Sequence, residues 1–188
     1  DFLEPMGHGR HIADAFGLPW YVLSAKATKL NPQDVMFPTL LEQVSHTTRL
    51  YETVLGRQLS GGQRENLERG LLGEALETLY RGFPDLSRVT PDLAPTCETV
   101  CDVLSNLGDK PAMQAIAHDL ADEIAGLCTG SGPWSAFLNG TTNVDLTRGG
   151  RDWISPRVFS FHELEGDPIL QALAYTQVLS AIRRDSLI

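Results

Sequence analysis

Apolar residues recur at helical spacing through the middle of the chain, while short apolar runs of the strand type lie towards its two ends. In the middle, apolar positions follow the i, i+3, i+4, i+7 rule of helices with one buried side. Pro38 is expected to divide or delay the first of these helices, because a proline ring cannot continue a helix. The pattern predicts helices in the stretches 35–55, 61–80, 96–107 and 111–127.

Residues suited to helix ends stand where these stretches begin and stop. Ser60 and Thr96 are predicted N-caps, because a hydroxyl oxygen can accept a hydrogen bond from a free amide of the first turn. Pro111 suits a first helical position, where the N–H that it lacks has no partner. Gly56 and Gly108 are predicted to end helices, since glycine readily adopts the left-handed conformation of a C-terminal cap.

Two runs rich in β-branched and aromatic residues predict short strands. The first is Trp20–Ser24, and it follows a short helix over residues 10–16 that Gly17 ends. The second covers about residues 157–162, opens after Pro156 and stops at a polar turn. We expect this second strand to be buried at the centre of the fold.

An apolar helix over about residues 168–184 follows the second strand. Asp167 is placed to cap its free amides, and Pro168 to occupy its first position. Apolar side chains cover most of its circumference between Ile169 and Ile182, which is typical of a helix packed between two layers. A strand, a short turn and a buried helix form the repeating unit of an α/β sheet, so we expect part of such a sheet.

These elements predict a predominantly helical α/β fold in three parts. Residues 1–32 form a strand-and-helix segment of the sheet, residues 33–129 an inserted all-helical subdomain, and residues 130–188 the return to the sheet. The sequence contains no internal repeat and no linker long enough to separate independent domains. The expected architecture is therefore a partial sheet with a helical insertion.

Composition is that of a folded protein, with 188 residues, 42% hydrophobic and 21% charged. The net charge of −9 argues against a broad basic face for nucleic acid, although a few arginines can still line a patch or a pore. No apolar run approaches the ~20 residues that span a bilayer. Three cysteines at no disulfide-framework spacing favour a reducing compartment such as the cytoplasm. Because the sequence starts at Asp1 without an initiator Met or a leader pattern, we expect it to be a piece of a larger protein.

Residues 59–64, Leu-Ser-Gly-Gly-Gln-Arg, spell the signature sequence of ABC transporter ATPases, whose Ser and Gly amides contact a nucleotide phosphate in a partner subunit. An ABC domain also has a loop ending in Gly-Lys-Ser/Thr and an acidic strand end after the signature, and this sequence has neither. We therefore favour a helix start capped by Ser60, with an ABC-type ATPase fragment as the alternative.

The histidines and cysteines predict no self-contained catalytic centre and no metal site. Residues 6–11 combine glycines with His8 and His11, but lack the third glycine of a dinucleotide fingerprint and a third metal ligand. Cys97 and Cys101 share a helix face without a partner pair, so both are expected to be small buried residues. The remaining histidines accompany no nucleophile in a suitable context: His46, His118 and His162.

Four arginines are candidates for a function in trans, since an arginine near a sheet edge can reach a phosphate bound by a neighbouring subunit. They are Arg148, Arg151, Arg183 and Arg184. The alternative for each of them is an ordinary solvated charge.

Several stretches, in order and spacing, resemble the conjugative-transfer ATPases of type IV secretion systems, relatives of the FtsK-like and HerA-like P-loop motors. The resemblance spans nearly the whole chain. Asp1 with residues 7–24 resembles an Asp-led turn, a short helix and a strand, and Leu30-Asn31-Pro32 resembles the step into a helical insertion. The other similar stretches are 59–80 and 95–104 (insertion helices), 130–146 (a Gly-rich turn and a Phe-x-Gly-x-Thr-like step) and 157–184 (the strand and helix before the second nucleotide motif).

The resemblance implies a partial RecA-like sheet between the two nucleotide-binding motifs of a longer chain. In the family, the phosphate-binding Gly-Lys-Thr loop precedes the position of Asp1, and the acidic metal-binding strand follows that of Ile188. The parent is then expected to hydrolyse ATP with Mg²⁺ as a homo-hexamer, whereas residues 1–188 alone are expected to be inactive. No catalytic or nucleotide-binding residue of the family corresponds to a position in this chain.

The function implied is that of a motor that energises channel or pilus assembly and substrate transfer, at the cytoplasmic side of the cell membrane. Expected partners are secretion-channel proteins, and either single-stranded DNA or protein as substrate. The alternative from another class is a non-enzymatic helical module that docks a partner protein. A closed helical bundle without a strand ladder through Phe159 would favour that module.

Overall fold

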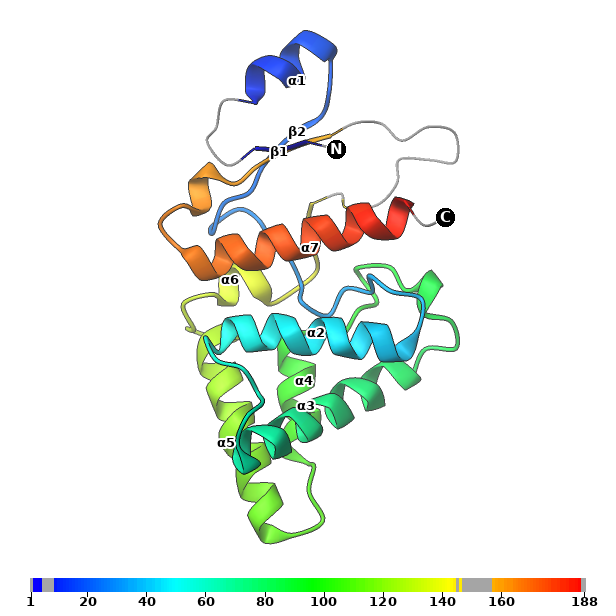
Figure 1. Ribbon diagram of the computed structural model, residues 1–188, viewed down its shortest axis with the longest axis vertical. Coiled ribbons are helices and arrows are strands. Elements are labelled where there is room, and N and C mark those ends of the chain that lie inside the picture. Colours follow the sequence, from blue (N-terminus) through cyan, green and yellow to red (C-terminus); the bar gives the residue numbers. More distant parts are fainter. Residues whose placement is uncertain (1, 5–8, 145, 147–156, 187–188) are drawn as a thin grey trace.

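The computed structural model describes residues 2–4, 9–144, 146 and 157–186. A small sheet lies at one end of the molecule and a block of helices at the other, with one long helix between them (Figure 1). The described part of the chain is mostly helical, as the periodicity predicts. It passes from the sheet to the helical block after the second strand and returns to the sheet before the third.

Three short parallel strands form the sheet: β1 (Phe2–Glu4), β2 (Trp20–Val22) and β3 (Val158–Ser160), in the order β1-β3-β2. Phe159 of β3 pairs with Leu3 on one side and Tyr21 on the other, so the predicted ladder through Phe159 is present. β3 is buried and central, as expected, but shorter than predicted. The chain turns directly after Phe161 into the 3₁₀ helix η2 (His162–Leu164).

Helices cover both faces of the sheet. The short helix α1 (Arg10–Phe16) lies on one side, and the long helix α7 (Pro168–Ser186) lies on the other, between the sheet and the helical block (Figure 1). Asp167 accepts hydrogen bonds at Oδ1 from the backbone N–H groups of Ile169 and Leu170, at 3.1 and 3.0 Å, which confirms it as a cap. The buried apolar positions of α7 are Leu170, Leu173, Ala174, Val178 and Ala181.

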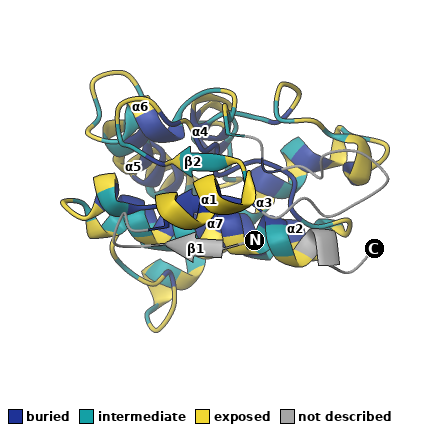
Figure 2. Cartoon of the chain, turned by 90° about the horizontal axis from the view of Figure 1, so that it is seen from above, coloured by how far each residue is buried: buried dark blue, intermediate teal, exposed yellow. Residues whose placement is uncertain are grey.

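Stacked aromatic rings join the sheet to its neighbours. Tyr21 and Phe159 stack across adjacent strands with ring centroids 5.3 Å apart. Phe161, just beyond β3, stacks on Tyr175 of α7 at 4.0 Å. By contrast, α1 is mostly exposed (Figure 2), and only Ala13 among its residues is buried. Phe16, which the sequence places with Ala13 on one apolar side, is 75% exposed.

The helical block contains α2 (Leu40–Val54), α3 (Gln63–Arg81), α4 (Cys97–Ser105) and α5 (Pro111–Cys128). Helix α2 begins only after Pro38, as predicted. Thr96 caps α4 and forms a reciprocal capping box with Thr99, and Pro111 occupies the first turn of α5. The short elements are α6 (Ser135–Leu138) and η1 (Leu86–Arg88).

The predicted start of α3 is wrong. The helix begins at Gln63, its N-cap is Gly62, and no side chain caps it. Gly61 has a φ of +108°, a conformation far from helical, so the chain cannot enter the helix before it. Ser60 therefore lies two residues too early to cap α3, and its hydroxyl instead donates to Gln58 Oε1 at 3.5 Å.

A fully buried amide, Gln43 on α2, fixes the extended segment that leads into the helical block. Its Oε1 accepts from the backbone N–H groups of Met36 and Phe37 at 2.8 and 3.1 Å. Its Nε2 donates to the backbone oxygen of Asp34 at 3.0 Å and to the hydroxyl of Tyr80 at 3.1 Å. Polar backbone groups inside the block are thus paired by a side chain rather than by a regular element.

Candidate functional site at the carboxyl edge of the sheet

The connections of neighbouring strands diverge at the carboxyl edge of the sheet. β1 lies beside β3, yet β1 leads into α1 on one face and β3 leads into α7 on the other (Figure 1). In open parallel sheets, ligands bind outside the carboxyl ends of strands at such a topological switch point. The edge between β1 and β3 is therefore the candidate functional site.

A serine and a histidine lie at this point. The Ser160 hydroxyl, fully buried at the end of β3, is hydrogen-bonded to Nδ1 of His162 at 2.8 Å. His162 is half-buried, and its Nε2 is the ring nitrogen left for a further partner. Sequence reasoning considered His162 without Ser160. A Ser-x-His pattern directly after a buried strand was the signal that could have found the pair.

The partial positive charge at the start of α7, next to this edge, is already compensated by the helix's own cap, Asp167. Asp167 receives two backbone N–H groups of the first turn, and its Oδ2 accepts from the indole N–H of Trp134 at 2.7 Å. Free amides at a helix start attract anions, but here a carboxylate of the same chain satisfies them. The start of α7 is consequently a structural contact between α6 and α7.

Of the four predicted arginines, the structure describes Arg183 and the backbone of Arg184, and both lie in the last turns of α7, away from this edge. Arg183 is exposed in the last turns of α7, roughly 24 Å from Asp167 at the ~1.5 Å rise per helical residue. Arg184 lies in α7, and Arg148 and Arg151 lie outside the described residues. An arginine not predicted as a site residue, Arg157, is buried at the opposite end of β3 with its guanidinium 5.7 Å from the Phe159 ring centroid.

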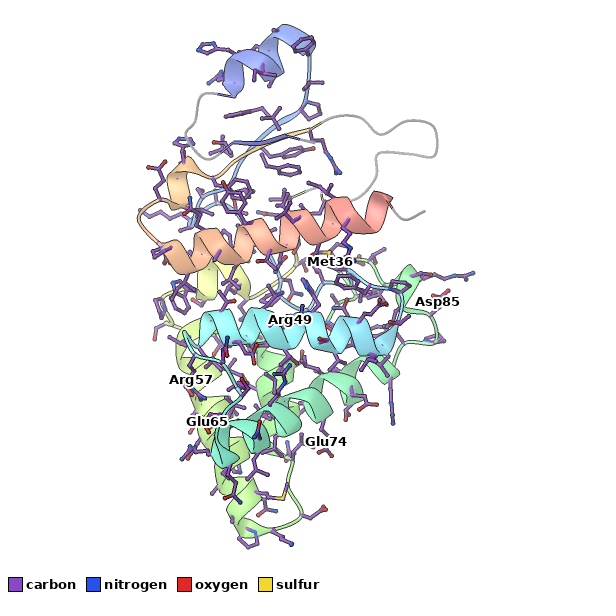
Figure 3. The ribbon with its side chains drawn as sticks, in the orientation of Figure 1. Met36, Arg49, Arg57, Glu65, Glu74 and Asp85 are labelled. Atoms are coloured by element: carbon purple, nitrogen blue, oxygen red, sulfur yellow. The ribbon has the colours of Figure 1, made fainter. Side chains whose placement is uncertain are left out.

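Ion pairs hold the loop that carries the ABC-like signature. Glu68 of α3, whose side chain is 3% exposed, accepts from Arg57 at 2.6 Å and from Arg64 at 2.9 Å. Burial alone would raise the pKa of Glu68, but the hydrogen bonds from both arginines outweigh it and hold the pKa below its usual value. The same arginines reach α5, with Arg57 bonded to Glu123 at 2.7 Å and Arg64 to Asp119 at 2.9 Å (Figure 3 labels Arg57). The signature loop is thus fixed to α3 and α5.

His46 and the three cysteines fit structural roles. His46 of α2 is 8% exposed and lies against the Phe37 ring at 5.1 Å, and burial, with Arg49 nearby, lowers its pKa to about 4. His118 is exposed. The cysteines are buried free thiols, as predicted for Cys97 and Cys101. Within the described ranges, no three His, Cys, Asp or Glu side chains gather as a metal site, and no helix is long and apolar enough to cross a membrane.

Comparison with known proteins gives a structural match and no match in sequence. No protein family matches the sequence, and no curated protein matches it. Among solved structures, the chain is similar to VirB4 of Thermoanaerobacter pseudethanolicus, with a TM-score of 0.72 and 20% identity. The match covers 97% of this chain and 48% of the VirB4 chain, so this chain spans about half the length of that protein. The likeness shows a shared fold that includes both the sheet and the helical block.

Proposed function

We propose that this chain is a segment of a type IV secretion motor ATPase, in which it forms part of a RecA-like sheet and the helical insertion attached to it. The observation that supports this best is the likeness to VirB4 over 97% of the chain. The resemblance of the sequence stretches to type IV secretion ATPases suggests the same family, but the support for the proposal comes from the structural likeness.

The sheet itself supports a place in a larger assembly of strands. Parallel sheets are normally buried on both faces and contain about four to six strands. The described sheet has three strands of three residues each, and the helix over one face is seven residues long and mostly exposed. Such a sheet is more stable as part of a wider RecA-like sheet than by itself.

In the proposed parent, ATP and Mg²⁺ bind to motifs on other parts of the polypeptide, and this segment supplies sheet strands and the helical block. The parent acts as a homo-hexamer at the cytoplasmic face of the membrane, contacts secretion-channel proteins, and moves single-stranded DNA or protein. Arg183, exposed on α7, and the three other arginines are proposed as groups that act on a neighbouring subunit.

Two other functions are weighed against this proposal. A non-enzymatic helical docking module predicts a closed helical bundle, and the parallel ladder through Phe159 argues against that architecture. An ABC-type ATPase predicts that Ser60 and Gly61 act in nucleotide turnover. Both residues are exposed in the signature loop, so substituting them tests this directly.

The experiment is ATP hydrolysis by the purified full-length protein, with and without Mg²⁺. The proposal predicts Mg²⁺-dependent hydrolysis that survives the double change Ser60→Ala and Gly61→Ala. Loss of hydrolysis in that variant, with its folding intact, would favour the ABC alternative. A full-length protein that neither binds nor hydrolyses ATP would favour the docking module and refute the proposal.

A further inference from the structure

Two segments far apart in the sequence lie together where the chain enters and leaves the helical block. The entry segment is residues 27–34 and the exit segment is residues 139–144. Each overlaps a stretch that resembles the type IV secretion ATPases: Leu30-Asn31-Pro32 lies in the first, and the Phe-x-Gly-x-Thr-like step that begins at Phe137 runs into the second. The structure thus joins two sequence features that the proposed function leaves unused.

Asn143 bonds to the entry segment through both its side chain and its backbone. Its Oδ1 accepts from the Lys29 N–H at 2.8 Å, and its Nδ2 donates to the Ala27 oxygen at 2.9 Å. Its own backbone N–H donates to the Lys29 oxygen at 3.2 Å. One asparagine therefore pairs with three backbone groups of a segment more than a hundred residues away in sequence.

Thr142 continues this contact towards the helical block. Its Oγ1 accepts from the Asn31 N–H at 2.8 Å and donates to a carboxylate oxygen of Asp34. The side chain of Asn31 in turn donates to the backbone oxygen of Pro95, at 2.7 Å, just before α4. We call these bonds the clasp: Asn143 with the backbone of Ala27 and Lys29, and Thr142 with Asn31 and Asp34.

Backbone geometry brings the two segments close. The Leu30 N–H donates to the Phe137 oxygen at 2.8 Å. Gly140 has a φ of +123°, and a Cβ at that position would lie 3.2 Å from Lys29 Nζ. The positive φ favours glycine at this turn, whereas the lysine side chain could move aside for a Cβ.

A hinge between two bodies lies in the chain segments that connect them, because those segments absorb the changes in φ and ψ. Here the entry segment lies within the connection from β2 to α2, and the exit segment lies within the described part of the connection from α6 towards β3. Since the clasp bonds one connection to the other, neither can rotate alone without breaking several hydrogen bonds. Helix α7, which covers the sheet, also packs against α2 of the helical block, so the two bodies contact each other outside the clasp as well.

We propose that the clasp makes the helical block move as one body with the sheet, so that a movement of the strands is transmitted to the block. This rests on the proposed function, in which ATP hydrolysis at the sheet drives substrate transfer. Asn31, Asp34, Thr142 and Asn143 are then positioning residues for energy coupling, and they take no part in ATP hydrolysis itself.

The test uses the full-length protein with Thr142→Val or Asn143→Ala. Each variant has a matched control whose side chain bonds only within its own helix: Thr176→Val on α7, where Oγ1 donates to the Ala172 oxygen, and Asn106→Ala at the end of α4, where Nδ2 donates to the Asp102 oxygen. Three quantities are measured: amide hydrogen exchange at Lys29 and Asn31, the rate of ATP hydrolysis, and substrate transferred per ATP hydrolysed.

We expect exchange at these amides to rise roughly tenfold in the clasp variants, because each variant removes the acceptor of one of them. ATP hydrolysis should stay within about twofold of the wild type, while transfer per ATP should fall roughly tenfold. A purely structural role would lower hydrolysis and transfer together and leave their ratio unchanged. The control variants should change none of the three quantities.

Unchanged amide exchange would show that the clasp does not hold the two segments together. Faster exchange with unchanged transfer per ATP would show that the clasp does not couple the sheet to the helical block. Either result overturns the inference. Should Thr142→Val fail to fold, Asn143→Ala decides, because its side-chain bonds are at the surface. Absence of ATP hydrolysis in the wild type refutes the proposed function instead. Exchange at Lys29 and Asn31 still decides whether the clasp holds.

Discussion

Replacing Gln43 by Met should strongly destabilise the helical block. The two side chains have similar length and volume, so the change removes hydrogen bonds and leaves the packing nearly intact. Gln43 is fully buried, and the N–H groups of Met36 and Phe37 would lose the acceptor that holds them at 2.8 and 3.1 Å. The backbone oxygen of Asp34 would also lose the donor at 3.0 Å.

A buried polar group left without its partner costs about 1–3 kcal/mol, so the loss at these three groups amounts to at least about 3 kcal/mol. For a chain of this size, a loss of about 3 kcal/mol lowers Tm by roughly 6–12 °C. Urea unfolding followed by circular dichroism measures the free energy of unfolding, with an unchanged slope expected for an unchanged fold. The matched control is Gln114→Met on an exposed position of α5, which should stay within about 0.5 kcal/mol. A Gln43→Met protein within about 1 kcal/mol of wild type would refute the reasoning.

Three further changes test other contacts by the same unfolding assay. His46 has a pKa of about 4 in the fold against 6.5 in the unfolded state, so the unfolded state binds the proton first as the pH falls. The free energy of unfolding should therefore fall by roughly 3 kcal/mol between pH 6.5 and 4. His46→Gln should remove this contribution to the pH dependence of stability, and identical pH profiles of the variant and the wild type would contradict the reasoning. Glu68→Ala leaves Arg57 and Arg64 without their shared carboxylate, so it should lower the free energy of unfolding by about 2–4 kcal/mol. The control Glu77→Ala removes a surface ion pair and should lower it by less than about 1 kcal/mol. Equal losses in the two variants would argue against a stabilising role for the ion pairs of Glu68. Thr96→Ala should cost about 1 kcal/mol through the lost cap of α4, and no loss would mean that the cap is not needed.

Local sequence signals were sufficient to predict most of the helices. Thr96 and Asp167 act as caps within three residues of the amides they bind, so sequence alone could identify them. Pro38 delays α2 because its ring and its missing N–H prevent a helix from running through it from the preceding residues. Ser60 was assigned wrongly because Gly61 can adopt either sign of φ, and only the fold selects the positive one.

Contacts between distant segments could not be predicted. The length of β3 depends on how far β1 and β2 run beside it, and this cannot be predicted from the residues of β3 alone. The bond between Asn31 and Thr142 joins positions 111 residues apart, and neither residue differs locally from an ordinary turn residue. The Ser160 and His162 pair is the exception, because it spans two positions and could have been read from the sequence.

The most direct test of the account is an experimental structure of the full-length protein with Mg²⁺ and a non-hydrolysable ATP analogue. We expect β1, β3 and β2 to continue into a wider parallel sheet, with the nucleotide at the carboxyl ends of its strands and the helical block as an attached insertion. A three-stranded sheet that stands alone, in a protein without bound nucleotide, would contradict it.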